Sequence, residues 1–133
     1  MRTAIACSPE RVFDTLSDLR REVEWNGRVT SAELRSAEPI GPGSTFAVVN
    51  GGTQYDVTLA TYERPNRLVV EARGNPDLTI TYTLSPTGDG TELESAFDFR
   101  PRGALKLLFL LLAPVIRRDV PKQYASLKAL CEH

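Results

Sequence analysis

The side chains best suited to chemistry in this 133-residue chain are a few aromatic and hydroxyl residues spread along it. Trp25, Tyr55, Tyr82 and Tyr124 each combine an apolar ring with one polar atom, and Ser95 adds a hydroxyl. Such side chains suit an amphipathic molecule, because the rings supply apolar contact while the polar atoms fix orientation. They could equally be core aromatics with locally satisfied hydroxyls, and both interpretations stay open here.

Other kinds of catalytic site find little support in the sequence. The single histidine is His133, the final residue, which leaves no partner for a Ser–His–Asp or Cys–His arrangement and argues against a metal site. Cys7 and Cys131 form no C-x-x-C pair, so free buried thiols are expected. We therefore expect no metal and no cofactor. A general acid or base would have to be a carboxylate, a tyrosine or a water.

The amino-acid composition limits the classes of partner that the protein is expected to bind. Sixteen Lys and Arg against seventeen Asp and Glu give a net charge of −1, so no electrostatic footprint for nucleic acid is present. Apolar residues at 41% and charged residues at 25% are ordinary globular values, and the length predicts one domain, residues 1–133. The N-terminal residues contain no leader-like apolar region, so a cytoplasmic location is expected.

The most apolar stretch, residues 104–116, raises the question of a membrane anchor. It is shorter than the roughly 20 apolar residues that span a bilayer, and Lys106 and Pro114 interrupt it. Stable membrane insertion is therefore not expected. The stretch is interpreted as the first part of a long buried helix.

The order of elements follows from capping, periodicity and turn residues. After a strand at 2–6, Ser8 can cap a helix that begins at Pro9 and ends near residue 17, and Asp18 can cap a second short helix, from Leu19 to about Trp25. Period-2 alternation between turn residues then predicts an antiparallel meander. Its six strands are expected at 28–35, 44–50, 53–62, 67–73, 77–85 and 91–99.

A helix over residues 103–131 is the only predicted element long enough to cover the dry face of this sheet. On a helical wheel, apolar residues from Leu105 to Leu127 share roughly 120° of arc, with Pro114 and Pro121 opposite, so the helix is expected to curve over the sheet. Strand alternation directs Tyr55, Thr61, Tyr82 and Ser95 inward. The predicted ligand-contacting residues are Trp25, Phe46, Tyr55, Leu59, Tyr82, Ser95, Phe97, Phe109, Leu112 and Tyr124.

Acidic residues fit this arrangement less well. Asp56 and Glu71 alternate onto the face opposite Tyr55 and Leu68, where solvated charges are expected. Asp119, at the edge of the predicted helix, is the best placed acidic candidate. In an enzyme, Tyr82 and Tyr55 would be the first choices for steering a proton.

The element order resembles the helix-grip fold of the START-like or SRPBCC superfamily, an α+β fold in which a seven-stranded antiparallel sheet wraps around a long C-terminal helix. Residues 6–18, Glu24-Trp25-Asn26, residues 41–46, residues 62–65, Gly90-Thr91 and residues 127–132 are similar to landmarks of that superfamily. The closest resemblance is to its polyketide cyclase or dehydrase branch. It implies a cavity between sheet and helix that holds apolar or amphipathic small molecules.

Three functions remain open, since a fold alone does not settle activity. The first is binding of an apolar or amphipathic, lipid- or polyketide-like molecule. The second is a polyketide cyclase or dehydratase that works by positioning its substrate. The third is an interaction module, because Leu107, Leu110 and Leu111 lie off the inner stripe and would need cover. Packing against the short helices, a homodimer through the C-terminal helix, a ligand portal or a membrane surface could each provide it.

Overall fold

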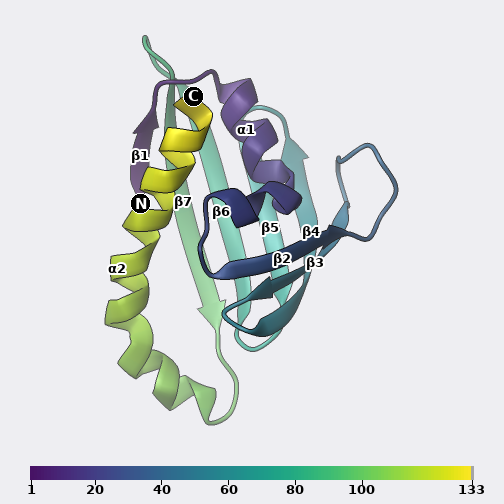
Figure 1. Cartoon of the computed structure of the whole chain (residues 1–133), viewed down its shortest axis with the longest axis vertical. Helices are drawn as coiled ribbons and strands as arrows, with labels where there is room; N and C mark the ends of the chain where they lie inside the picture. The colour runs from purple at the N-terminus through teal and green to yellow at the C-terminus, as the bar shows by residue number, and fades with distance from the viewer. Residues whose placement is uncertain (133) are drawn as a thin grey trace.

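The computed structural model describes residues 1–132, except for the side chains of residues 109, 112, 113, 115 and 116. A twisted sheet forms one layer, and a long helix together with two short ones lies against its concave face (Figure 1). This is the α+β helix-grip architecture that the sequence predicts.

The sheet contains seven antiparallel strands in the order β1-β7-β6-β5-β4-β3-β2. The six-strand meander is therefore confirmed, and the N-terminal strand pairs with the last one at the edge. The strands are β1 (Arg2–Ile5), β2 (Val29–Leu34), β3 (Thr45–Asn50), β4 (Thr53–Glu63), β5 (Arg67–Arg73), β6 (Asp77–Pro86) and β7 (Thr91–Arg100).

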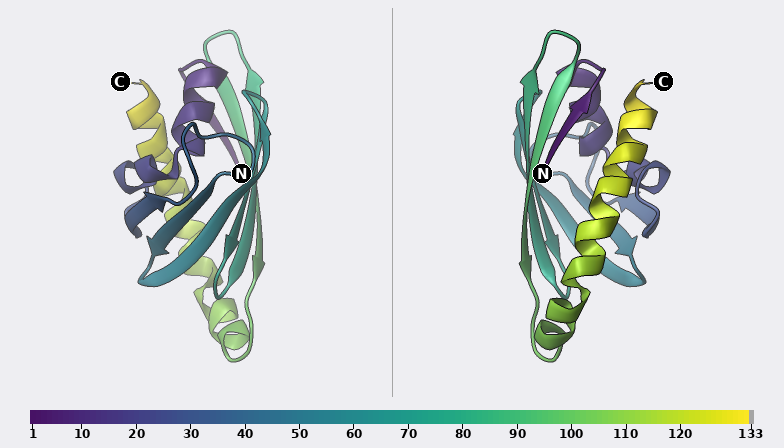
Figure 2. Two further views of the ribbon diagram at one scale, coloured as in Figure 1. Left: turned by 90° about the vertical axis from the view of Figure 1, so that its right-hand side faces the viewer. Right: turned by 90° about the vertical axis from the view of Figure 1, so that its left-hand side faces the viewer.

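The two short helices follow β1, as expected. The α1 helix (Pro9–Ser17) begins with proline, and the Ser8 side chain accepts a hydrogen bond from the Arg11 amide across its first turn. The next element, η1, is a 3-10 helix (Leu19–Glu24) capped by Asp18. Together they lie over one end of the sheet's concave face (Figure 2).

The C-terminal helix α2 (Leu105–Glu132) passes through Pro114 and Pro121 without ending. Both prolines are exposed, as expected for residues opposite the inner stripe. The helix begins below the lower end of the short helices and rises along β7 to the C-terminus (Figure 1). Of its predicted inner stripe, Phe109, Leu112 and Ile116 have side chains outside the described part of the chain.

The packed core covers the inner face of β6 and β7 at only one end of these strands. There Leu84 pairs with Leu93 across β6 and β7, and both are buried with Leu127 of α2 and Phe13 of α1. One step along the same strands the core ends, at the pair Tyr82 and Ser95. The two steps beyond, Ile80–Phe97 and Leu78–Phe99, are half-buried. On β6 and β7, the inner surface below Tyr82 is therefore less covered than the surface above it, whereas Val70 of β5, opposite Ile80, is buried.

One register detail departs from strict alternation. The pairing of β4 with β5 shifts between Leu59 and Thr61, which leaves Thr61 opposite Val69 and Tyr62 opposite the buried Leu68. A bulge of this kind moves every later side chain of the strand to the other face. Tyr62, rather than Thr61, therefore packs against the core, where its ring lies edge-on to Phe13. The inward assignment of Thr61 is wrong for this reason.

Candidate functional site

A cavity of about 430 Å³ lies between the concave sheet face, η1 and the middle of α2. Its lining is mostly apolar on the sheet side and carries polar groups near η1 and α2. The described lining residues are Leu19, Glu22, Trp25, Asn26, Arg28, Val48, Asn50, Gly51, Thr53, Tyr55, Val57, Val70, Ala72, Asn75, Pro76, Leu78, Ile80, Tyr82, Phe97, Phe99, Leu105, Asp119, Val120, Gln123 and Tyr124.

Burial along the strands gives this cavity an inner end and a mouth. Tyr82, Trp25 and Tyr124 are buried at the inner end, where the core stops, while Leu78 and Leu105 near the far end are only half-buried. A row of aromatic rings runs between the two ends. Trp25 and Tyr124 lie 6.4 Å apart between ring centroids, Tyr124 and Phe97 6.4 Å, and Phe97 and Phe99 6.1 Å. These rings provide a continuous apolar wall with few polar atoms.

A hydroxyl cluster closes the inner end. The Tyr124 hydroxyl donates to Ser95 Oγ at 2.7 Å, and Tyr82 is hydrogen-bonded with Tyr124. Burial raises the pKa of Tyr82 well above its usual value and that of Tyr124 to about 12. Both phenols are therefore neutral near pH 7 and act there as hydrogen-bonding groups, not as bases.

Glu22 lines the same end of the cavity from η1. Its Oε1 accepts a hydrogen bond of 3.2 Å from Asn26 Nδ2, while Asn26 Oδ1 accepts one of 3.1 Å from the Arg28 amide. Because Arg28 fixes the oxygen of the amide, the Asn26 NH₂ group faces Glu22. Desolvation raises the pKa of Glu22 to about 7, an effect that the Asn26 hydrogen bond only partly offsets. The negative charge of Glu22 in turn raises the pKa values of Tyr82 and Tyr124.

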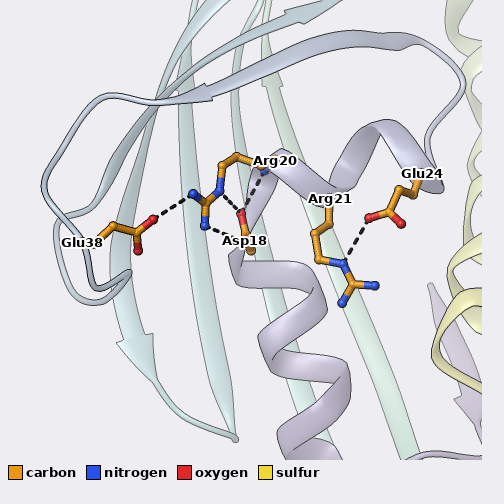
Figure 3. Close-up of polar contacts among 5 residues, drawn as sticks. All are labelled: Asp18, Arg20, Arg21, Glu24 and Glu38. Carbon is orange, nitrogen blue, oxygen red and sulfur yellow. Dashed lines mark hydrogen bonds and ion pairs between the residues drawn. The ribbon is translucent and has the colours of Figure 1, made fainter.

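The other charged residues of this short helix face solvent (Figure 3). Arg20 binds Asp18 at 2.8 Å and Glu38 at 2.8 Å, and Arg21 binds Glu24 at 3.1 Å. These exposed ion pairs leave Glu22 as the one carboxylate of η1 that borders the cavity. A 3-10 helix repeats every three residues, so Leu19 and Glu22 share a side.

A second polar group on the lining is an ion pair between the residue before β2 and the middle of α2. Arg28 Nη1 is 3.6 Å from Asp119 Oδ2, and both side chains are partly exposed. This pair links the segment before β2 to the middle of α2. Asp119, the acidic candidate suggested by the sequence, is thus a cavity residue with its charge balanced by Arg28.

Two further features shape the wall. The Trp25 indole nitrogen is buried and has no hydrogen-bond partner among the described residues. The ring of Tyr55 lies against Gly74, where a β-carbon would come within 2.6 Å of the ring. The absence of a side chain at Gly74 therefore lets Tyr55 lie back against the β5–β6 turn.

The structure brings together about half of the predicted ligand residues. Trp25, Tyr55, Tyr82, Phe97 and Tyr124 line the cavity. Ser95 is buried immediately behind Tyr124 and hydrogen-bonded to it.

The remaining predicted ligand residues lie elsewhere. Phe46 and Leu59 are on the expected face of the sheet but fully buried, at 1% and 0% exposure, and are absent from the described lining. The side chains of Phe109 and Leu112 lie outside the described part of the chain. Asp56 and Glu71 are exposed, as expected from alternation.

Glu22 is the main residue that the sequence analysis missed. Nothing in the local pattern distinguishes it from its neighbours, because η1 is only six residues long and is rich in charge. The one available signal is that Glu22 and Asn26 lie close in the sequence to Trp25, which is a predicted ligand contact.

Comparison with known families assigns all of the described residues to one family. The family model for polyketide cyclase, dehydrase and lipid transport proteins matches residues 1–132. The chain belongs to this family. No curated protein matches the sequence.

Solved structures share the fold of this polyketide cyclase, dehydrase and lipid transport family member. A START superfamily protein from Mycobacterium smegmatis superimposes with a TM-score of 0.78 at 13% identity, over 99% of this chain and 94% of the other. A protein from Thermus thermophilus gives 0.76 at 20% identity, over 97% and 92%. A Bacillus halodurans protein gives 0.77 at 14% identity, over 99% and 94%. These likenesses establish a START-like fold.

Neither a metal site nor a membrane-spanning helix is found among the described residues of this family member. They contain no group of three or more His, Cys, Asp or Glu side chains that could hold a metal ion. Within the same residues, no helix is both long and apolar enough to cross a bilayer.

Proposed function

We propose that this protein binds an apolar or amphipathic small molecule, lipid- or polyketide-like, in the cavity between the sheet and α2. The observation that carries the proposal is the cavity of about 430 Å³, whose sheet side is apolar and whose inner end holds a few hydrogen-bonding groups. Sites for small molecules commonly have this size and this division between apolar lining and few polar atoms. Membership of a family that includes lipid transport is consistent with it.

The aromatic row supports the same proposal. Phe97 and Phe99 are half-buried although they occupy the inward positions of β7, and Ile80 and Leu78 opposite them are half-buried too. Apolar side chains left partly uncovered on a concave surface gain by contact with an apolar ligand, at about 25 cal/mol per Å² removed from water. Binding would thus cover the inner face of β6 and β7 below Tyr82.

A pair of alanine substitutions tests the proposal. Ala72 lines the cavity, whereas Ala96 is exposed on the outer face of β7. Ala72→Phe should fill part of the cavity and reduce binding of a ten-carbon alcohol at least tenfold, measured by calorimetry. Ala96→Phe makes the same change on the outer face and should leave the affinity unchanged. Native mass spectrometry of the purified protein should reveal a bound compound whose amount falls in Ala72→Phe. Equal binding by both variants would refute a ligand site at this position.

A cyclase or dehydratase activity is the second candidate. The observation that favours it is Glu22, because a carboxyl with a pKa of about 7 can both accept and donate a proton at neutral pH. Tyr82 and Tyr55 are poorer candidates, since burial raises the pKa of both phenols, which makes them weaker proton donors and leaves less phenolate to act as a base at neutral pH. Turnover of a poly-β-ketone mimic that is lost in Glu22→Gln but kept in Tyr55→Phe would support this candidate.

The third candidate, an interaction module, is favoured by the first half of α2. Leu107, Leu110 and Leu111 are 74%, 72% and 76% exposed, and no described residue covers them. A homodimer through this helix is the simplest arrangement that would bury them. It predicts a concentration-dependent mass in sedimentation experiments that Leu111→Lys reduces to the monomer.

A further inference from the structure

Few charged groups border the cavity, and they differ in whether an opposite charge balances them. Among the described lining residues only Glu22, Arg28 and Asp119 carry charged side chains. Arg28 and Asp119 form an ion pair with each other, 3.6 Å apart. The charge presented to a ligand therefore depends on Glu22 alone: the three groups sum to zero when it is protonated and to −1 when it is ionised.

The neighbours of Glu22 offer no cation to balance it. Asn26, after η1, is neutral and donates one hydrogen bond, to Oε1. The facing groups on the other elements are Tyr82 of β6 and Tyr124 of α2, with Ser95 of β7 behind them, and both phenols stay protonated.

The hydroxyls of Tyr82, Tyr124 and Ser95 also form hydrogen bonds with one another. The Tyr124 hydroxyl donates to Ser95, and Tyr82 is hydrogen-bonded with Tyr124. Among the described residues at this end, no cation acts on Glu22, and the buried donor without a partner is the neutral Trp25 indole N–H. An anionic head group would therefore find one neutral donor there and no opposite charge. An isolated charge in such a setting is costly unless it is paired.

We propose that Glu22 determines the charge of the ligand, so that the cavity accepts molecules whose buried polar end is neutral or cationic and discriminates against anions such as fatty acids. This inference rests on the proposed binding function and specifies its ligand class. A ligand hydroxyl can donate to Glu22 Oε2, for which no partner is found among the described residues, and a ligand carbonyl can accept from the carboxyl when it is protonated. An ammonium group can pair with the carboxylate. A ligand carboxylate would instead face a like charge.

The expected pH dependence has a definite sign. Glu22 has a pKa of about 7, so it is mostly neutral at pH 6 and mostly ionised at pH 8.5. A bound anion raises the pKa of Glu22 further, so the affinity for the anion falls as the pH rises. A bound cation lowers the pKa of Glu22, so the affinity for the cation increases as the pH rises. Each tenfold change in affinity corresponds to one unit of pKa difference between the free and bound protein.

Three probes with one ten-carbon chain and fixed head-group charge test this inference: decan-1-ol, decane-1-sulfonate and decyltrimethylammonium. Binding is measured by calorimetry at pH 6 and pH 8.5. Relative to decanol, the sulfonate should bind about tenfold more weakly at the higher pH and the ammonium about tenfold more tightly. Glu22→Gln, which keeps the shape of the side chain, should abolish both changes. Glu24→Gln removes an exposed carboxylate of the same helix, paired with Arg21, and should preserve them.

A direct titration gives a second measurement. The carboxyl carbon of Glu22, followed by NMR, should titrate near pH 7 in the free protein, with a midpoint that falls when the ammonium probe binds and rises with the sulfonate.

The outcomes separate the two proposals. If none of the three probes binds the wild-type protein, the proposed binding function fails and this inference fails with it. If decanol binds but the charged probes show no pH dependence, or keep it in Glu22→Gln, only the charge selection is refuted. Retained decanol binding by Glu22→Gln shows that the variant is folded.

Discussion

The two halves of α2 both contain leucines, yet they have opposite relations to the rest of the molecule. In the C-terminal half, Leu127 and Tyr124 are 0% and 2% exposed, whereas Leu111 in the N-terminal half is 76% exposed. The C-terminal half contacts β1 and α1, which close the core above the level of Tyr82. The N-terminal half continues past the lower end of the short helices (Figure 2), and its leucines Leu107, Leu110 and Leu111 are exposed. Whether a leucine of α2 is buried therefore depends on which elements pack against that part of the helix, and not on the helix sequence alone.

The contrast is tested most strongly by truncating one leucine in each half. Leu127→Ala should lower the free energy of unfolding by about 3 kcal/mol, because it removes a fully buried side chain and leaves a void. Leu111→Ala should change it by less than about 0.5 kcal/mol. Urea unfolding followed by circular dichroism measures both. Equal losses would mean that the N-terminal half also packs tightly.

The pH dependence of stability tests the burial of Glu22, whose carboxyl lies near the C-terminal half of α2. Burial raises the pKa of Glu22 from 4.5 to about 7, so its contribution to stability is fully present below pH 4.5 and is lost as the pH rises through about 7. Glu22→Gln should therefore stabilise the protein by about 2 kcal/mol at pH 8.5 and by almost nothing at pH 4. Glu24→Gln should show no such difference. A gain independent of pH would indicate a packing effect instead of a charge effect.

The attachment of the packed half to β7 also depends on one polar contact. Tyr124→Phe removes the hydrogen bond to Ser95 and leaves a buried hydroxyl without that partner, which should cost about 1 kcal/mol. Adding Ser95→Ala to this variant should cost less than it does in the wild type, because the orphaned group is removed. Additive losses in thermal unfolding would contradict a direct contact between the two hydroxyls.

The smallest effect is expected at the boundary between the halves. Arg28 and Asp119 link α2 to the segment before β2, but both side chains are partly exposed. A double-mutant cycle with Arg28→Gln and Asp119→Asn should give a coupling of no more than about 0.5 kcal/mol, which high salt removes. A larger coupling that resists salt would show that this pair holds the lower helix in place.

Much of the fold could be predicted because the local signals agree with one another. Ser8 before Pro9 marks the start of α1, and the alternation of Leu78, Ile80, Tyr82 and Leu84 identifies the inner face of β6. The same alternation fails after Leu59, because a bulge adds one residue to β4 and leaves no clear trace in the sequence.

The site was predicted less completely, since a sequence pattern gives the face of a strand but not the height along it. Leu59 and Tyr55 share one face of β4, yet Leu59 lies in the core and Tyr55 lines the cavity. Glu22 was missed for a different reason. Its role depends on the desolvation that η1, β6 and α2 impose together, and no single segment encodes that environment.

The contact between Gly74 and Tyr55 has a consequence for altering the protein's selectivity. Gly74 is absent from the described lining of the cavity, but a methyl group there would come within 2.6 Å of the Tyr55 ring and push it forward. Gly74→Ala should therefore shorten the longest ligand that fits, without changing any atom that the ligand touches in the wild type. Substitutions at Gly74, which lies behind the cavity wall, could thus change the ligand length that engineered variants accept. They would do so independently of the charge preference proposed for Glu22.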